Sequence, residues 1–171
     1  RLGHMKRRGA ADWSQIKRVR EALKIPVVGN GDIQCAEDVI TMLEQTGCDA
    51  VMVGRALAAR PWLLWQVGEK LGFAKPQSQA AMRAPQTPEE EGVEYGRALL
   101  SLIEIMEQHF DLENALKRVR FHLRMTVGWL EFGHHLSAQM SRAQTFEEMR
   151  QVTVTFFAVP QAMNARTHLR E

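Results

Sequence analysis

Two stretches of the chain share one pattern. In each, a short apolar run ends in a glycine-containing turn that leads into a helix. The first is Ile25–Ile33, where Ile-Pro-Val-Val is followed by Gly-Asn-Gly-Asp. The second is Asp49–Leu57, where Ala-Val-Met-Val is followed by Gly-Arg. A strand, a helix and a second strand at this spacing predict a βαβ unit with a parallel pair. Two consecutive strand–turn–helix units with glycine at the strand ends indicate the last two units of a (β/α)₈ TIM barrel, where that fold commonly binds phosphate.

The length of the chain limits this interpretation. A complete barrel needs about 250 residues, and the chain has 171. We therefore expect a fragment that holds only the last barrel units. Two strands without their neighbours expose long edges and an apolar face, so we expect aggregation or oligomers that form through those edges. The alternative is a monomer in which residues 1–70 are unfolded.

Composition excludes several classes of protein. With 45% hydrophobic and 25% charged residues, the chain resembles an ordinary globular protein. No apolar run approaches the roughly 20 residues of a membrane span. Cys35 and Cys48 form no CxxC motif, and no cysteine and histidine cluster has the spacing of zinc ligands. We expect a cytoplasmic protein with no membrane segment and no metal site.

The remaining periodicity predicts an α/β portion followed by an all-α portion. Residues 72–88 are rich in Gln, Ser, Ala and Pro and lack a hydrophobic period, so they predict a linker. The expected domains are residues 1–71 (last βα units of a TIM barrel), 72–88 (linker) and 89–171 (a C-terminal helical bundle), with a frayed tail after Pro160. The expected helices cover about residues 13–23, 36–45, 88–109, 112–130, 137–140 and 145–157, with one more beginning near Pro61. The expected strands, buried on both faces, cover about residues 25–28 and 50–53.

The glycine-containing turns carry the candidate anion site. The sequence Gly29-Asn30-Gly31-Asp32 can place backbone N–H groups at the start of a helix. Gly54 allows a second close approach, and the guanidinium of Arg55 can hold a phosphate through two hydrogen bonds. The alternative is a helix-capping turn in which Arg55 pairs with a carboxylate.

Three segments in this order resemble the tRNA-dihydrouridine synthases. They are Gly-Ala-Ala-Asp-Trp at residues 9–13, Ile-Pro-Val-Val-Gly-Asn-Gly-Asp-Ile at 25–33, and Gly-Cys-Asp-Ala-Val-Met-Val-Gly-Arg-Ala-Leu at 47–57, followed by Pro61-Trp62. The resemblance covers residues 9–70 strongly and the helical remainder loosely. It implies a barrel that holds FMN and a C-terminal helical domain that helps to bind tRNA. It also implies reduction of uridine to 5,6-dihydrouridine, with NADPH as the reductant.

The resemblance assigns roles by position. Asn30, Gly31 and Asp32 match the FMN contacts of the seventh strand, and Gly54 and Arg55 match the FMN phosphate contacts of the eighth. The catalytic cysteine of the family lies upstream of the matched segments, and neither cysteine of this chain stands at its position. We therefore expect no catalytic residue in this chain, and no activity from the chain alone.

The expected helix at 112–130 gives a separate indication of nucleic acid. At 100° per residue, its apolar side chains fall on one narrow face, and Lys117, Arg120 and Arg124 form a ridge beside it. Such a ridge can contact the phosphates of tRNA. The alternative is a solvated face that pairs with glutamates of the preceding helix. The resemblance favours tRNA.

Two other functions remain open at this point. The chain can be part of another FMN-dependent TIM-barrel oxidoreductase that acts on a small molecule, because the phosphate site of these barrels is widely shared. It can also be a helical RNA-binding module without enzymatic activity, which would bind tRNA and have no measurable affinity for flavin.

Overall fold

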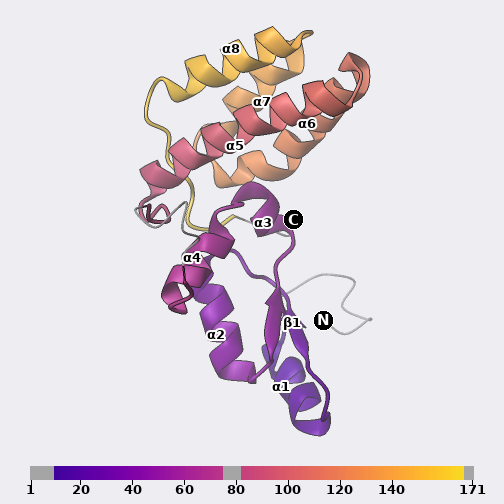
Figure 1. Cartoon of the computed structure of the whole chain (residues 1–171), viewed down its shortest axis with the longest axis vertical. Helices are drawn as coiled ribbons and strands as arrows, with labels where there is room; N and C mark the ends of the chain where they lie inside the picture. Colours follow the sequence, from indigo (N-terminus) through magenta and orange to yellow (C-terminus); the bar gives the residue numbers. More distant parts are fainter. Residues whose placement is uncertain (1–9, 75–81, 168–171) are drawn as a thin grey trace.

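The computed structural model describes residues 10–74 and 82–167. Within them the chain is mostly helical, with two short strands near its start (Figure 1). The elements are α1 (Trp13–Ala22), β1 (Val28–Asn30), α2 (Ala36–Thr46), β2 (Ala50–Met52), α3 (Arg55–Ala59), α4 (Leu63–Lys70), α5 (Pro88–His109), α6 (Leu112–Thr126), the 3₁₀ turn η3 (Val127–Trp129), α7 (Gly133–Arg142) and α8 (Phe146–Phe157). Helices α5 to α8 lie at one end of the long axis, α1, β1 and α2 lie at the other, and α3 and α4 lie between them (Figure 1).

The predicted parallel pair is confirmed. Strands β1 and β2 run parallel, with Val28 opposite Ala50 and Asn30 opposite Met52. Helix α2 connects the two strands and ends at Gly47, which adopts the left-handed conformation with φ of 64°. Glycine tolerates this conformation at a helix end because it has no Cβ atom.

The predicted burial of the strands on both faces is wrong for this chain. Gly29 is buried against side chains of the α2 side, whereas Val28 and Met52 on the other face are 61% and 51% exposed. Ile25, which was expected to lie in the first strand, precedes β1 and is exposed. Helix α2 covers only one face, and no other described element covers the second. The exposed apolar face expected of a two-stranded sheet is therefore present.

The segment after β2 differs from its expected structure. The helix expected near Pro61 is present as α4, which begins at Leu63. The expected turn before it is instead the short helix α3, which begins at Arg55, directly after Gly54. Proline disfavours helical backbone in the residue before it. Arg60, with φ of −131° and ψ of 71°, accordingly ends α3 and separates the two helices.

Helices α5 to α8 surround one apolar core, to which α3 and the following turn also contribute. The buried side chains of this core include Ala56, Ala59, Trp62, Leu99, Ile103, Val119, Leu123, Leu136, Met140 and Met149. The start of α5 agrees with its prediction, because Thr87 caps the helix, forms a capping box with Glu90 and is followed by proline.

The middle of the helical portion is divided differently from the prediction. The expected helix at 112–130 is shorter, since α6 ends at Thr126 and continues as the 3₁₀ turn η3. Helix α7 is longer than expected and begins at Gly133, where a Cβ atom would lie 2.3 Å from the carbonyl oxygen of Val127. This close approach requires glycine at the start of α7.

The expectation of a frayed tail after Pro160 is wrong for residues 161–167, and residues 168–171 lie outside the described residues. Residues 161–167, called the strap below, run back from α8 towards α2 (Figure 1). Met163 is 2% exposed, and its N–H donates to the carbonyl oxygen of Pro88 at 2.9 Å. The N–H of Asn164 donates to the carbonyl oxygen of Trp129 at 2.7 Å. Long-range hydrogen bonds hold this segment, and they leave no periodic signal in a sequence.

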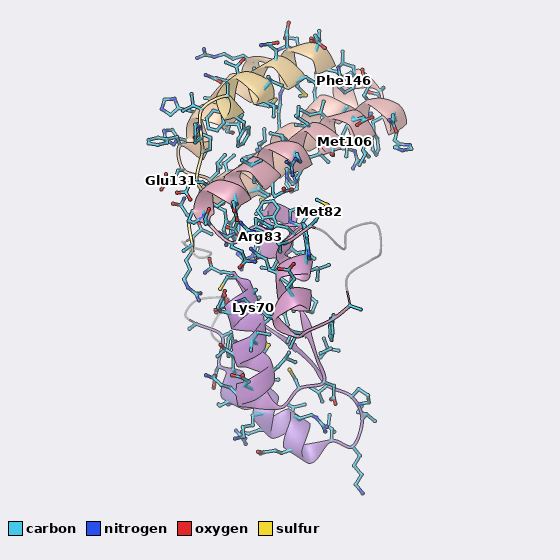
Figure 2. The ribbon with its side chains drawn as sticks, turned by 60° about the vertical axis from the view of Figure 1, so that its left-hand side comes forward. Lys70, Met82, Arg83, Met106, Glu131 and Phe146 are labelled. Carbon is cyan, nitrogen blue, oxygen red and sulfur yellow. The ribbon has the colours of Figure 1, made fainter. Side chains whose placement is uncertain are left out.

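The predicted linker is partly packed. Residues 75–81 lie outside the described residues, but Ala84 is fully buried and its N–H donates to the Glu69 carboxylate at 3.1 Å. The side chain of Gln66 donates to the carbonyl oxygen of Pro85 at 2.8 Å. Arg83 accordingly lies between α4 and the helical portion (Figure 2). The division of the chain into domains at 72–88 stays a prediction.

Among the helices of the described residues, none is both long enough and apolar enough to cross a membrane.

Candidate functional site

A cavity of about 190 Å³ lies at the carboxyl ends of β1 and β2. Because the two strands are parallel, the turns that follow them meet at the same edge of the sheet. The cavity is lined by Asn30, Gly31, Asp32, Ile33, Met52, Gly54 and Arg55. The structure therefore brings together all five residues that were predicted to hold the cofactor.

The first turn adopts a conformation that requires glycine. Gly31 has φ of 138°, and a Cβ atom there would lie 2.6 Å from the Cβ atom of Ala11. Asp32 follows with φ of 57°, in the left-handed region. Aspartate tolerates this region better than most residues. The turn is therefore specified by its residues and by the segment that packs behind it.

That segment lies just before and within the start of α1. Trp13 donates its indole N–H to the carbonyl oxygen of Gly31 at 3.0 Å, and the N–H of Ala11 donates to Asp32 Oδ2 at 2.6 Å. Asp12 caps α1 by accepting from the Ser14 N–H at 3.0 Å. The contacts of Ala11 and Trp13 with the first turn join residues about 20 positions apart. No local pattern in the sequence reveals such contacts.

Asn30 joins the two strand ends. Its side-chain Nδ2 donates to the carbonyl oxygen of Met52 at 3.0 Å. This bond and the bond from Ala11 to Asp32 show that both polar side chains of the first turn contribute to its shape. Asn30, Gly31 and Asp32 of this turn line the cavity.

The second turn contributes open space and positive charge. A Cβ atom at Gly54 would meet no atom within 4 Å, so the glycine leaves room at the wall of the cavity. Arg55 follows it and is exposed. A guanidinium and glycine-containing turns beside a space of this size suit a phosphate dianion. The residues present therefore fit the phosphate end of a cofactor.

The residues predicted to contact RNA lie on α6. Lys117 is exposed and pairs with Glu113 of the same helix at 2.6 Å, rather than with a glutamate of α5. Arg124 is also exposed, with its guanidinium 6.0 Å from the ring centre of Phe121. Arg120 is half-buried, and its Nη2 donates to the carbonyl oxygen of Ala143 at the end of α7 at 2.6 Å. The structure thus places two of the three at the surface and engages the third in helix packing.

Charge is unevenly divided among the helices of this portion. Helix α6 carries four Lys and Arg residues and one Glu, and α7 carries one Arg, two His and no acid. Helix α5 carries six Glu and one Arg. Helix α5 packs on both α8 and α6, and α6 also packs on α7, so the acidic helix α5 lies against the basic helix α6.

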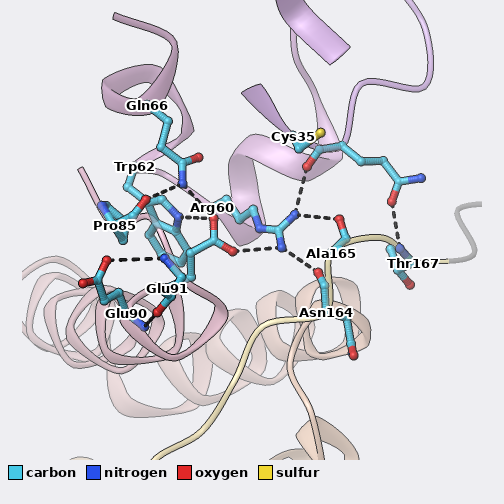
Figure 3. Close-up of polar contacts among 12 residues, drawn as sticks. Cys35, Arg60, Trp62, Gln66, Pro85, Glu90, Glu91, Asn164, Ala165 and Thr167 are labelled. Atoms are coloured by element: carbon cyan, nitrogen blue, oxygen red, sulfur yellow. Dashed lines mark hydrogen bonds and ion pairs between the residues drawn. The ribbon is translucent and has the colours of Figure 1, made fainter. Parts of the chain in front are cut away.

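A buried arginine links the α/β portion to the helices (Figure 3). The side chain of Arg60 is 3% exposed and pairs with Glu91 of α5 at 3.0 Å. It also donates to the carbonyl oxygens of Gln34 at 3.0 Å and Asn164 at 2.6 Å. Sequence reasoning missed this residue. The available signal was a single charge within the apolar run from Ala56 to Trp65, because a charge in such a run needs a buried partner.

The strap forms a second link. Arg166 donates two hydrogen bonds to the Asp38 carboxylate of α2, at 2.6 and 3.2 Å. Burial by itself would raise the pKa of Asp38, but the hydrogen bonds from Arg166 and from the Gln34 N–H outweigh it and lower that pKa. Burial raises the pKa of the neighbouring Cys35 thiol. A raised pKa disfavours the thiolate, which is the reactive form of cysteine.

Among the residues that the structure describes, no three His, Cys, Asp or Glu side chains are grouped so that they could hold a metal ion.

Comparison with known proteins gives one consistent family. Residues 1–164 match the family model of dihydrouridine synthase. The chain is 31% identical over 142 residues to a Mycobacterium tuberculosis protein named "Probable tRNA-dihydrouridine synthase", with 82% of this chain and 34% of the relative covered. It is 31% identical over 156 residues to tRNA-dihydrouridine synthase B of Xanthomonas axonopodis, with 87% and 42% covered. The chain thus spans between about a third and two fifths of the length of these relatives.

Proposed function

The chain belongs to the dihydrouridine synthase family, and from that premise we propose that it is part of an FMN-dependent tRNA-dihydrouridine synthase. In this proposal α1 to α4, with β1 and β2, form the last units of a (β/α)₈ barrel, and α5 to α8 contact tRNA. The cavity that joins the two strand ends is the observation that supports it most strongly, because the phosphate site of such barrels lies at this place.

In this proposal, residues at the ends of the two strands bind the phosphate of the cofactor, and residues of α6 bind the substrate. Arg55 and the backbone N–H groups of the two turns would hold the phosphate of FMN. Gly54 keeps the space that the phosphate needs, and Trp13 holds the first turn in place. Bound FMN, with NADPH as its reductant, would supply the reducing equivalents for uridine.

The substrate side of the proposal rests on α6. Lys117, Arg120 and Arg124 are proposed to contact the phosphates of tRNA, with Arg120 also holding the end of α7. A tRNA substrate would place the protein in the cytoplasm. The chain holds no catalytic residue in this proposal, so we expect it to form no dihydrouridine alone.

The phosphate site is tested by comparing FMN with riboflavin, which lacks the phosphate. Isothermal titration of the chain should show that FMN binds more tightly, and Arg55→Ala should remove most of the difference, about 10-fold or more, as expected for a charge-assisted contact worth about 1.5–3 kcal/mol. Arg97→Ala, at an exposed position of α5, is the matched control. Equal affinities of the wild-type chain for the two flavins would refute the phosphate site.

We also infer that the exposed face of the two-stranded sheet mediates association of the isolated chain. Val28 and Met52 form an apolar surface that no described element covers. Sedimentation velocity should show oligomers that Val28→Lys disperses. A wild-type chain that stays monomeric at high concentration would refute this inference.

A further inference from the structure

Phe121 occupies the most exposed line of α6. At 100° per residue it points away from Val119 and Leu123, which are buried in the core. Its side chain is 58% exposed, so the ring contributes little to the packing of the helices. The ring is therefore available for contact with a partner.

The neighbours of Phe121 on the helix surface are cationic or apolar. Lys117 and Arg124 flank the ring on one side, and Arg118 and Met125 flank it on the other. The Arg124 guanidinium lies 6.0 Å from the centre of the Phe121 ring, within the range of a cation–π contact. Met125 is 47% exposed and extends the apolar surface. The ring thus stands in the middle of a basic helix face.

The positive charge of α6 and the exposed ring of Phe121 together favour one kind of partner. A partner that complements the charge of α6 is a polyanion, and one that covers an isolated ring offers a flat apolar face. An unpaired stretch of RNA offers both, because its phosphates are negative and its unstacked bases expose their π-faces. A regular RNA duplex offers only the phosphates, since its bases are stacked on one another.

We propose that Phe121 stacks on an unpaired nucleobase of tRNA while Lys117 and Arg124 contact the phosphates beside it. This inference rests on the proposed binding of tRNA and adds the contact that distinguishes a loop of the tRNA from its paired stems.

The test uses the whole chain and an unmodified tRNA transcript, with affinity measured by fluorescence anisotropy at two salt concentrations. Phe121→Ala should weaken binding roughly 5- to 150-fold at both concentrations, the range for loss of one stacked base. Phe121→Trp should retain the affinity. Lys117→Ala should instead reduce the dependence on salt, because it removes a phosphate contact.

Two controls make the result specific. Ile105→Ala changes an exposed apolar residue of the acidic helix α5 and should leave tRNA binding unchanged. A fully paired RNA duplex should bind wild type and Phe121→Ala equally. If wild type binds tRNA and Phe121→Ala binds it as tightly, the stacking contact is refuted and tRNA binding stands. If the wild-type chain does not bind tRNA, both are refuted.

Discussion

Arg60 carries a buried charge whose stability depends on the groups around it. A guanidinium removed from water is stable only when its N–H groups find acceptors, and four carbonyl or carboxylate groups surround this one (Figure 3). The same carboxylate of Glu91 accepts from Trp62 at 3.0 Å and from Gln66 at 2.9 Å. Loss of the arginine would leave several buried acceptors without donors.

Replacement of Arg60 by Met should therefore lower the free energy of unfolding by about 3 kcal/mol, the magnitude for breaking a buried ion pair by removal of one partner. Urea unfolding of the chain measures the change. Arg83→Met is the control, since Arg83 forms a surface pair with Glu90 and its loss should change stability little. Equal effects of the two substitutions would show that Arg60 does not act as a buried link.

His122 should make stability depend on pH. Burial lowers the pKa of His122 below its ordinary value of 6.5, so the folded chain favours the neutral ring. Below about pH 6.5 His122 binds a proton in the unfolded chain but not in the folded chain. The free energy of unfolding therefore falls as the pH decreases, until the pH reaches the pKa of His122 in the folded chain.

Unfolding measured between pH 7.5 and 5 should accordingly show a loss of stability that His122→Gln reduces. His135→Gln, at an exposed position of α7, should keep the wild-type dependence. An unchanged pH profile in His122→Gln would contradict the proposed cause.

Helix α5 and the strap approach each other closely at Gly92. A Cβ atom at Gly92 would lie 2.0 Å from the carbonyl oxygen of Gln161, so α5 and the strap can meet only at glycine. Gly68 in α4 offers a comparison, because a Cβ atom there would meet Phe73 at an ordinary 4.0 Å. Substitution by Ala raises the helix propensity equally at both positions. Only position 68 has space for the added Cβ atom.

Gly68→Ala should stabilise the chain by about 0.5–1 kcal/mol, the gain in helix propensity. Gly92→Ala should destabilise it by roughly 1–3 kcal/mol, because the strap must move away from α5. Thermal unfolding of both variants tests the pair. A stabilising Gly92→Ala would mean that the strap is not held against α5.

The elements that were predictable carry their signals locally. The start of α5 is marked by Thr87, Pro88 and Glu90, and the end of α2 is marked by Gly47. The five residues of the cavity followed from two glycine-containing turns and from the rule that parallel strands end at one edge. The strap lacked such a signal, because hydrogen bonds to residues far along the chain hold it. The exposed face of the sheet depends on which elements cover it, which periodicity alone does not specify.

At the scale of the whole molecule, the cavity and the basic helix belong to one connected structure. Arg60, the strap and the shared apolar core all join the α/β portion to α5–α8. A tRNA bound by α6 would therefore lie in a defined orientation relative to the cavity at the ends of β1 and β2. In the proposed function, the chain would supply the phosphate end of a flavin site and a surface for RNA.

The most direct test of this account is the formation of dihydrouridine by a chimera. The matched part of the Mycobacterium tuberculosis relative is replaced by this chain, and the tRNA product is measured by mass spectrometry with FMN and NADPH present. We expect the two added hydrogens of dihydrouridine to appear, and Arg55→Ala in the chimera to reduce both the flavin content and the product. A folded chimera that carries FMN, binds tRNA and forms no dihydrouridine would contradict the account.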